Sequence, residues 1–282
     1  MGFFDGLKRD TKQARTVEEV DRPQTQEQEV VVAEEELVDD PENIEVVVRE
    51  VEDYAAPVIP QEPLKSYKDK APVRHVVGQT KIIAIINQKG GVGKSTTAIN
   101  LGAALGEMGK QVLLVDLDPQ GNCSSGLGVE KSLIQQCIYD VLLNDVPLEE
   151  VIIPDIAEGL DIAPATINLA GAEVELVSEM ARENRLKDAV GGMRGKYDFI
   201  LIDCPPSLGL LTVNALVAAD KLLIPIQCEF YALEGVTKLL ESMKRVKSRL
   251  NPTLDIYGIL LTMYDSRTTL SKQVVDEVRE YF

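Results

Sequence analysis

The sequence predicts an α/β fold in which a mostly parallel sheet is flanked by helices, preceded by a largely disordered acidic N-terminal extension. One observation behind this prediction is a series of short runs that are apolar at successive positions and so leave no side facing water. Another is that stretches with apolar residues at helical spacing separate these runs. Strands buried on both faces and separated by helices are typical of a parallel sheet covered on both sides.

Six apolar runs are short enough to form one strand each. They span residues 82–86, 112–115, 160–163, 199–202, 222–226 and 256–261. The helices are expected at residues 95–108, 168–190, 208–219, 232–250 and 270–282. Because ligands of such sheets bind at the carboxyl ends of the strands, candidate functional residues are sought there.

The composition changes near residue 80, which divides the chain in two. Residues 1–80 hold 19 acidic and 10 basic residues, together with many prolines, glutamates and valines, and this mixture is typical of disorder. Residues 81–282 are expected to form the folded domain. The chain stops inside a predicted helix without a termination signal, so we expect this domain to be truncated at its C-terminus.

Composition excludes several classes of function. With His75 as the single histidine, catalysis or metal binding through imidazole is not expected. The four cysteines fit neither a zinc site nor a disulfide framework, which favours a cytoplasmic location. No apolar stretch reaches the roughly 18 to 20 residues that span a bilayer, so a membrane is not an expected partner. A net charge of −17 means that nucleic-acid binding would need a local basic patch.

A glycine-rich segment, QKGGVGKST from Gln88 to Thr96, joins the first predicted strand to the first predicted helix. It contains the pattern G-x-x-G-K-[ST], although Gln88 stands where the longer phosphate-loop pattern has glycine. Glycines allow backbone N–H groups to converge on phosphate, and the helix N-terminus adds a positive dipole end. The sequence therefore predicts a P-loop NTPase that binds ATP through Lys89, Gly90, Gly91, Val92, Gly93, Lys94, Ser95 and Thr96.

Aspartates at the ends of two other strands complete the candidate site. Lys94 can reach the β- and γ-phosphates, and the Ser95 hydroxyl can ligate Mg²⁺. Asp116 and Asp203 are expected to support the Mg²⁺ through water, and Asp118 to orient an attacking water. A single aspartate at such a position is more often a helix cap or a turn residue. Because this chain also carries the phosphate loop, we expect these aspartates to belong to the nucleotide site.

The segment from Lys89 to Thr97, KGGVGKSTT, resembles the deviant Walker A motif of the ParA/MinD/nitrogenase iron-protein superfamily. The segments DPQGN (118–122), DCPPSL (203–208), EFYALEG (229–235) and TMYDSRT (262–268) narrow the resemblance to ParA/Soj partition ATPases. It extends over roughly residues 80–282. The resemblance implies an ATP-dependent homodimer with ATP and Mg²⁺ as cofactors. Its catalytic residues would be Lys89, which reaches the partner subunit's nucleotide, Lys94 and Asp118.

The resemblance also implies partners and a location. The partners are nonspecific double-stranded DNA and a ParB/Spo0J-like protein that stimulates hydrolysis. The protein itself would be cytoplasmic and nucleoid-associated, and would act in chromosome or plasmid partition. Arg267 matches an arginine that the family uses for DNA contact. A basic cluster on one predicted helix is a weaker DNA-binding candidate, since such runs are usually solvated helix faces: Lys244, Arg245, Lys247 and Arg249.

Two other classes of function remain open. A ParA-like ATPase that positions a membrane or cell-pole complex and uses DNA little would be favoured by the N-terminal turn at Phe3 and Phe4 and by the acidic extension. A metabolic P-loop enzyme is the third class. Its iron-protein form is disfavoured because no cysteine pair lies where a shared cluster could be ligated, and its kinase form would need an acceptor pocket. ATP-dependent retention on DNA separates the first class from the second, and phosphorylation of an added acceptor would identify the third.

Overall fold

The computed structural model describes residues 79–229 and 234–282. The predicted N-terminal extension, except its last two residues, lies outside these ranges. None of the helices within them combines the length and the apolarity needed to cross a membrane. The strands are β1 (Lys81–Ile85), β2 (Val112–Asp116), β3 (Ile153–Ala157), β4 (Leu160–Ala163), β5 (Phe199–Asp203), β6 (Lys221–Gln227) and β7 (Asp255–Thr262).

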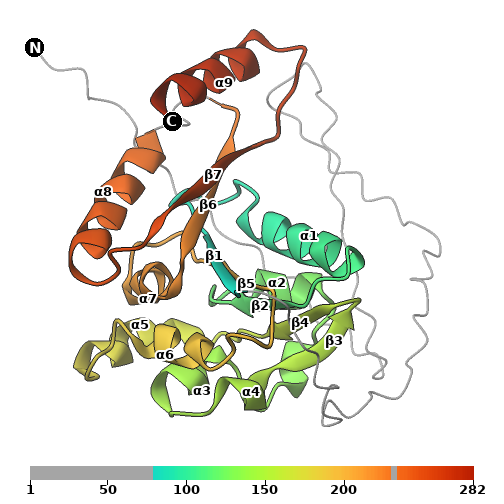
Figure 1. Ribbon diagram of the computed structural model, residues 1–282, viewed down its shortest axis with the longest axis vertical. Helices are drawn as coiled ribbons and strands as arrows, with labels where there is room; N and C mark the ends of the chain where they lie inside the picture. The colour runs from blue at the N-terminus through green and yellow to red at the C-terminus, as the bar shows by residue number, and fades with distance from the viewer. Residues whose placement is uncertain (1–78, 230–233) are drawn as a thin grey trace, which may run out of the picture. The chain divides into compact units, whose positions relative to one another are not determined.

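The helices alternate with these strands along much of the chain (Figure 1). The α-helices are α1 (Lys94–Glu107), α2 (Asn122–Gly126), α3 (Ile138–Leu143), α4 (Leu148–Val151), α5 (Leu169–Glu175), α6 (Arg185–Gly191), α7 (Leu210–Ala218), α8 (Glu234–Arg249) and α9 (Thr269–Tyr281). Two short 3₁₀ helices are η1 (Lys131–Leu133) and η2 (Leu176–Ser178).

The strands form one sheet in the order β3-β4-β2-β5-β1-β6-β7. Every neighbouring pair is parallel except β3 and β4, which confirms the predicted mostly parallel sheet. Asp203 of β5 is in register with both Ile85 of β1 and Asp116 of β2. The carboxyl ends of these three adjacent strands are therefore level, and the loops that follow them meet at one edge.

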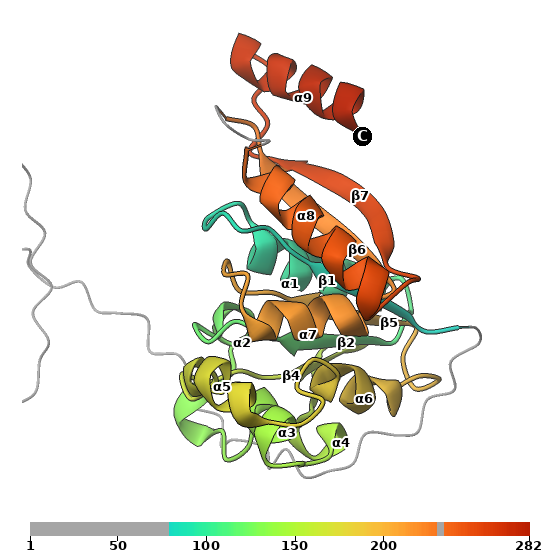
Figure 2. The same cartoon turned by 90° about the vertical axis from the view of Figure 1, so that its left-hand side faces the viewer.

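Two apolar cores cover the two faces of the sheet, because successive side chains of a strand point to opposite sides. Along β1, Ile82 and Ala84 belong to the larger core, while Ile83 and Ile85 belong to the smaller one. The larger core takes side chains from α3, α5, α6, α7, α8 and α9. The smaller core takes side chains from α1 and α2 (Figures 1 and 2).

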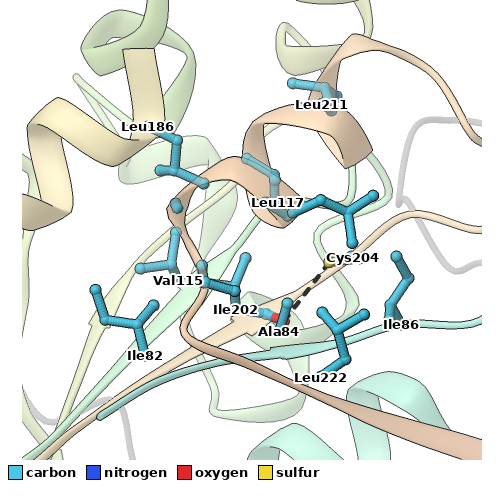
Figure 3. Close-up of a cluster of buried hydrophobic side chains, with 14 of the residues drawn as sticks. Ile82, Ala84, Ile86, Val115, Leu117, Leu186, Ile202, Cys204, Leu211 and Leu222 are labelled. Atoms are coloured by element: carbon cyan, nitrogen blue, oxygen red, sulfur yellow. Dashed lines mark hydrogen bonds between the residues drawn. The ribbon is translucent and has the colours of Figure 1, made fainter. Parts of the chain in front are cut away.

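The larger core includes side chains of the strands that lead into the candidate site. Figure 3 labels Val115, Ile202 and Leu222, from three different strands, together with Leu211 of α7, and all four belong to this core. In the same view the Cys204 thiol donates a hydrogen bond of 3.8 Å to the Ile202 carbonyl. The strand ends are thus anchored in close-packed apolar surroundings, which favours fixed positions for the polar residues that follow.

The six predicted strands are confirmed to within one residue at each end. The helices predicted at 95–108, 208–219, 232–250 and 270–282 are confirmed to within two residues at the ends that the structure describes. The prediction of one helix at 168–190 is wrong, because α5 and η2 end before Glu179 and the chain turns through Ala181 at a φ of 51° before α6 begins. The Asn214 amide fixes this break by donating to the Arg182 carbonyl and accepting from the Leu186 N–H.

The close approach of α1 to the β3–β4 turn depends on Gly106, and we expect Gly106→Ala to destabilise the protein. A Cβ added to Gly106 would lie 1.9 Å from the Glu158 carbonyl oxygen, so helix or turn would have to move. Overpacking of this kind costs about 1–3 kcal/mol of the free energy of unfolding. The control is Gly191→Ala at the end of α6, where nothing lies within 4 Å of the added Cβ. Equal urea midpoints for the two variants would contradict the expectation.

Candidate nucleotide-binding site

The glycine-rich segment forms an open loop between β1 and α1. Gly91 and Gly93 have φ values of 75° and 88°, which glycine adopts without strain. A Cβ built at Gly90 or Gly91 would meet nothing within 4 Å, so space is open beside the loop. The first hydrogen bond of α1 runs from the Thr97 N–H to the Gly93 carbonyl, at 2.8 Å. The N–H groups that precede Thr97 are therefore not used by the helix. The loop fits the phosphate cradle that the sequence predicts.

Lys94 begins α1 and is nearly buried, with 6% of its surface exposed. Its ammonium donates a 3.1 Å hydrogen bond to the Lys89 carbonyl and so lies across the loop. Burial lowers the pKa of Lys94, while the nearby carboxylates of Asp203 and Asp118 raise it. Lys94 and two predicted carboxylates, Asp118 and Asp203, are therefore brought together.

Side chains from neighbouring strands brace the loop. The Asn87 amide accepts from the Lys89 N–H at 3.0 Å and donates to the Pro225 carbonyl of β6 at 2.7 Å. At the end of β7, the Thr262 hydroxyl donates to the Val92 carbonyl at 2.9 Å. Sequence reasoning missed these braces, because the chain positions that meet here lie up to 170 residues apart.

Lys89 is the exposed lysine of the loop, and its ammonium forms an ion pair with Glu229. Glu229 follows the end of β6, so this pair joins two loops at the same edge of the sheet. Both side chains are partly exposed, and an ion pair in that setting is weak. Lys89 is therefore held within its own chain by a contact that can be exchanged at little cost.

Asp203 ends β5 beside the loop, fully buried, and carries a polar atom without a partner. Burial raises its pKa to about 7, although the Ser95 hydroxyl nearby lowers it. Its Oδ2 accepts a hydrogen bond from the Cys123 thiol at 3.1 Å, whereas Oδ1 has no hydrogen-bond partner. A buried acceptor left unsatisfied is costly, and a cation with its bound water would satisfy it. This carboxylate fits the predicted magnesium site.

No cluster of three or more His, Cys, Asp or Glu side chains in the described ranges could hold a metal directly. In the prediction, Ser95 is the direct ligand of the metal and the aspartates act on it through water. Asp116 is turned toward its own loop, since its Oδ2 accepts from the Ser124 N–H and hydroxyl and its Oδ1 from the Asp118 N–H. Burial raises the pKa of Asp116 to about 6, and the Ser124 bonds oppose this shift.

Asp118 lies two residues beyond β2 at the same edge, and 6% of its surface is exposed. Its Oδ1 accepts from the Gln120 N–H at 2.9 Å, and the Lys131 ammonium donates to the Gln120 carbonyl at 2.5 Å. Gln120 and Lys131 also line a cavity of about 470 Å³. The Asp118 loop is thus fixed by its own Asp118–Gln120 contact and by Lys131 of η1. No motif in the sequence marks Lys131 for this role.

The structure does not bring the predicted DNA-binding residues together. The basic residues of α8 lie toward its C-terminal end, where Lys247 is 3.7 Å from Asp255 at the start of β7. Arg267 lies beyond the opposite end of β7, a strand of eight residues that spans about 23 Å. The Arg267 side chain is 87% exposed and forms a two-pronged ion pair with Asp265.

Residues 80–256 match the family described as an AAA domain. The chain is 58% identical over 202 residues to the sporulation initiation inhibitor protein Soj of Bacillus subtilis, covering 72% of this chain and 80% of Soj. It is 57% identical over 202 residues to the chromosome partitioning protein ParA of Myxococcus xanthus, covering 72% of this chain and 71% of that protein.

Solved structures share the fold. A cobyrinic acid a,c-diamide synthase from Mycobacterium smegmatis, solved with bound ADP and magnesium, has a TM-score of 0.69 at 44% identity, covering 72% of this chain and 82% of that one. A plasmid partition protein from Borrelia burgdorferi has a TM-score of 0.64 at 29% identity, covering 72% and 86%. Since the relatives are more than half identical over most of their own length, the chain belongs to the ParA/Soj family of partition ATPases.

Proposed function

We propose that this protein is a dimerising partition ATPase. It binds nonspecific DNA in its ATP state and hydrolyses ATP when a ParB-like partner stimulates it, in chromosome or plasmid segregation. The observation that carries the proposal is the convergence of the phosphate loop, Lys94, Asp118 and Asp203 at one edge of the sheet. The names of the relatives, partition proteins from several bacteria, support it.

ATP would bind with its phosphates in the loop of residues 90–95, where open space and unused N–H groups lie together. Lys94 would neutralise charge on the β- and γ-phosphates, and the Ser95 hydroxyl would hold Mg²⁺ directly. Asp203 would support the Mg²⁺ through water, as would Asp116 from farther away. Bound Mg²⁺ would supply charge neutralisation to the transferring phosphoryl group. Asp118 would orient the attacking water, from a loop already fixed by Gln120 and Lys131.

Two further contacts would change when ATP joins two subunits. Lys89 would leave Glu229 of its own subunit for the nucleotide of the partner subunit, which the exposed ion pair permits at little cost. Arg267 would exchange Asp265 for a DNA phosphate, since its side chain lies in solvent. The protein would then be cytoplasmic and nucleoid-associated, with the 81–282 domain as its ATPase unit.

Sedimentation with ADP or with ATP and Mg²⁺, in the presence and absence of nonspecific duplex DNA, tests the proposal. We expect a dimer with ATP only, and association of that dimer with DNA that weakens as salt rises. Arg267→Ala should weaken DNA association and lower the salt slope by about one per lost phosphate contact. The control is Lys110→Ala, which removes one exposed charge at the opposite edge of the sheet.

The outcomes separate the remaining classes of function. A dimer that forms with ATP and does not bind DNA would favour an ATPase that positions a membrane or cell-pole complex. Equal loss of DNA association in Arg267→Ala and Lys110→Ala would show that overall charge, and not Arg267, governs the binding. If ATP produces no dimer, the proposed mechanism is wrong at its first step.

A further inference from the structure

Cys123 lies at the start of α2, directly behind the Asp118 loop, and is completely buried. Its thiol donates a hydrogen bond to Asp203 Oδ2 at 3.1 Å, and its sulfur lies 3.6 Å from the Ser95 carbonyl oxygen. One side chain thus links the segment after β2, the end of β5 and the first turn of α1. None of the roles described above uses this thiol.

The hydrogen bond fixes the plane of the Asp203 carboxylate. The terminal torsion of an aspartate is broad, so an unrestrained carboxylate can rotate about it. Here Oδ2 is occupied by the thiol and Oδ1 is buried without a partner. The contact therefore holds the carboxylate plane in an orientation that leaves one oxygen, Oδ1, unsatisfied beside the phosphate loop.

Ser124, the residue after Cys123, makes the corresponding contact with Asp116. Ser124 donates from both its N–H and its hydroxyl to Asp116 Oδ2, at 2.8 and 2.7 Å. Two consecutive residues at the start of α2 therefore hold the two carboxylates that are in register across β2 and β5. This pairing distinguishes Cys123 from an ordinary buried cysteine such as Cys204, whose thiol donates to the carbonyl of Ile202.

We propose that Cys123 is a positioning residue for the magnesium site. Its thiol holds the Asp203 carboxylate so that Oδ1 faces the water shell of the metal that accompanies ATP. This inference rests on the proposed function, because it assigns a role toward Mg²⁺ bound with the nucleotide. Cys123 itself does not contact the metal or the reacting atoms.

The test measures the Mg²⁺ concentration at which binding of a fluorescent, non-hydrolysable ATP analogue is half-maximal. For Cys123→Ala we expect this concentration to rise about three- to tenfold, because one modest hydrogen bond no longer orients Asp203. Binding of the analogue without Mg²⁺ and the melting temperature without Mg²⁺ should change little. Cys123→Ser, whose hydroxyl can donate to Oδ2 in place of the thiol, should restore most of the Mg²⁺ response.

Cys204→Ala is the matched control, since it removes a buried thiol next to Asp203 that does not donate to the carboxylate. It should leave the Mg²⁺ midpoint unchanged. An unchanged midpoint in Cys123→Ala, an equal rise in Cys204→Ala, or a serine variant as defective as the alanine variant would each overturn the assignment. If Cys123→Ala does not fold, Cys123→Val, which fills the site without a hydrogen-bond donor, takes its place, and an unchanged midpoint in that variant counts against the assignment.

The Mg²⁺ dependence of the unmodified protein distinguishes a failure of this inference from a failure of the proposed function. If it binds the analogue with no dependence on Mg²⁺, the proposed function is at fault. If it shows that dependence and Cys123→Ala shares its midpoint, only the role of Cys123 is wrong.

Discussion

Asp118→Ala is expected to bind ATP and Mg²⁺ but to hydrolyse ATP at least about a hundredfold more slowly, so that an ATP-bound dimer accumulates. The reason is that Asp118 is the carboxylate proposed to orient the attacking water, whereas the phosphate loop and Lys94 are proposed to bind the nucleotide. Single-turnover hydrolysis measures the chemical step, and sedimentation after addition of ATP and Mg²⁺ measures the accumulated dimer.

The control for this prediction is Asp118→Asn, which keeps the geometry of the loop. Its amide oxygen can still accept from the Gln120 N–H, so the loop stays clamped by Lys131. Because the amide is neutral, it orients and polarises water less well than a carboxylate. If both variants are slow, the defect is chemical, and if only alanine is slow, the loop has moved. Normal hydrolysis by Asp118→Ala would show that Asp118 has no part in the reaction.

The central strands and the phosphate loop could be predicted because local sequence specifies them. Apolar runs such as 199–202 are buried on both faces, and only a covered parallel sheet accommodates them in this order. Residues 88–96 combine glycine, lysine and serine at spacings that phosphate binding requires. Aspartates at strand ends then fall at one edge, since parallel strands end together.

The remaining features depend on contacts between distant segments, which periodicity does not encode. The region 168–190 has the apolar spacing of one helix, yet the Asn214 amide of α7 stabilises a turn within it. Glu229 pairs with a lysine 140 positions earlier, and Cys123 meets an aspartate 80 positions later. Strand β3 was not predicted either, because the edge strand has partly exposed residues and includes Pro154, which the edge position tolerates.

Lys89→Ala is expected to retain nucleotide binding as a monomer and to lose the ATP-dependent dimer. In the described chain the Lys89 ammonium contacts Glu229, and its backbone takes part in the loop, where the N–H donates to Asn87 and the carbonyl accepts from Lys94. Alanine keeps that carbonyl, so the cradle and the charge of Lys94 stay in place. Lys94→Ala is the contrasting variant, since loss of the buried ammonium should weaken ATP binding itself, by about tenfold or more. Titration with a fluorescent ATP analogue and sedimentation distinguish the two variants.

Glu229→Ala completes the comparison, because Lys89→Ala also removes the partner of Glu229. If the lysine acts only through this ion pair, the two variants should lose the dimer equally. If Lys89 acts across the dimer, Glu229→Ala frees the ammonium from its own subunit, and the dimer should form at the same or a lower ATP concentration. An ATP-dependent dimer in Lys89→Ala would contradict the trans role outright. Loss of the dimer in Glu229→Ala alone would assign the interface to the carboxylate. The exposed ion pair between the two side chains makes either result easy to read, because breaking it changes the stability of the monomer little.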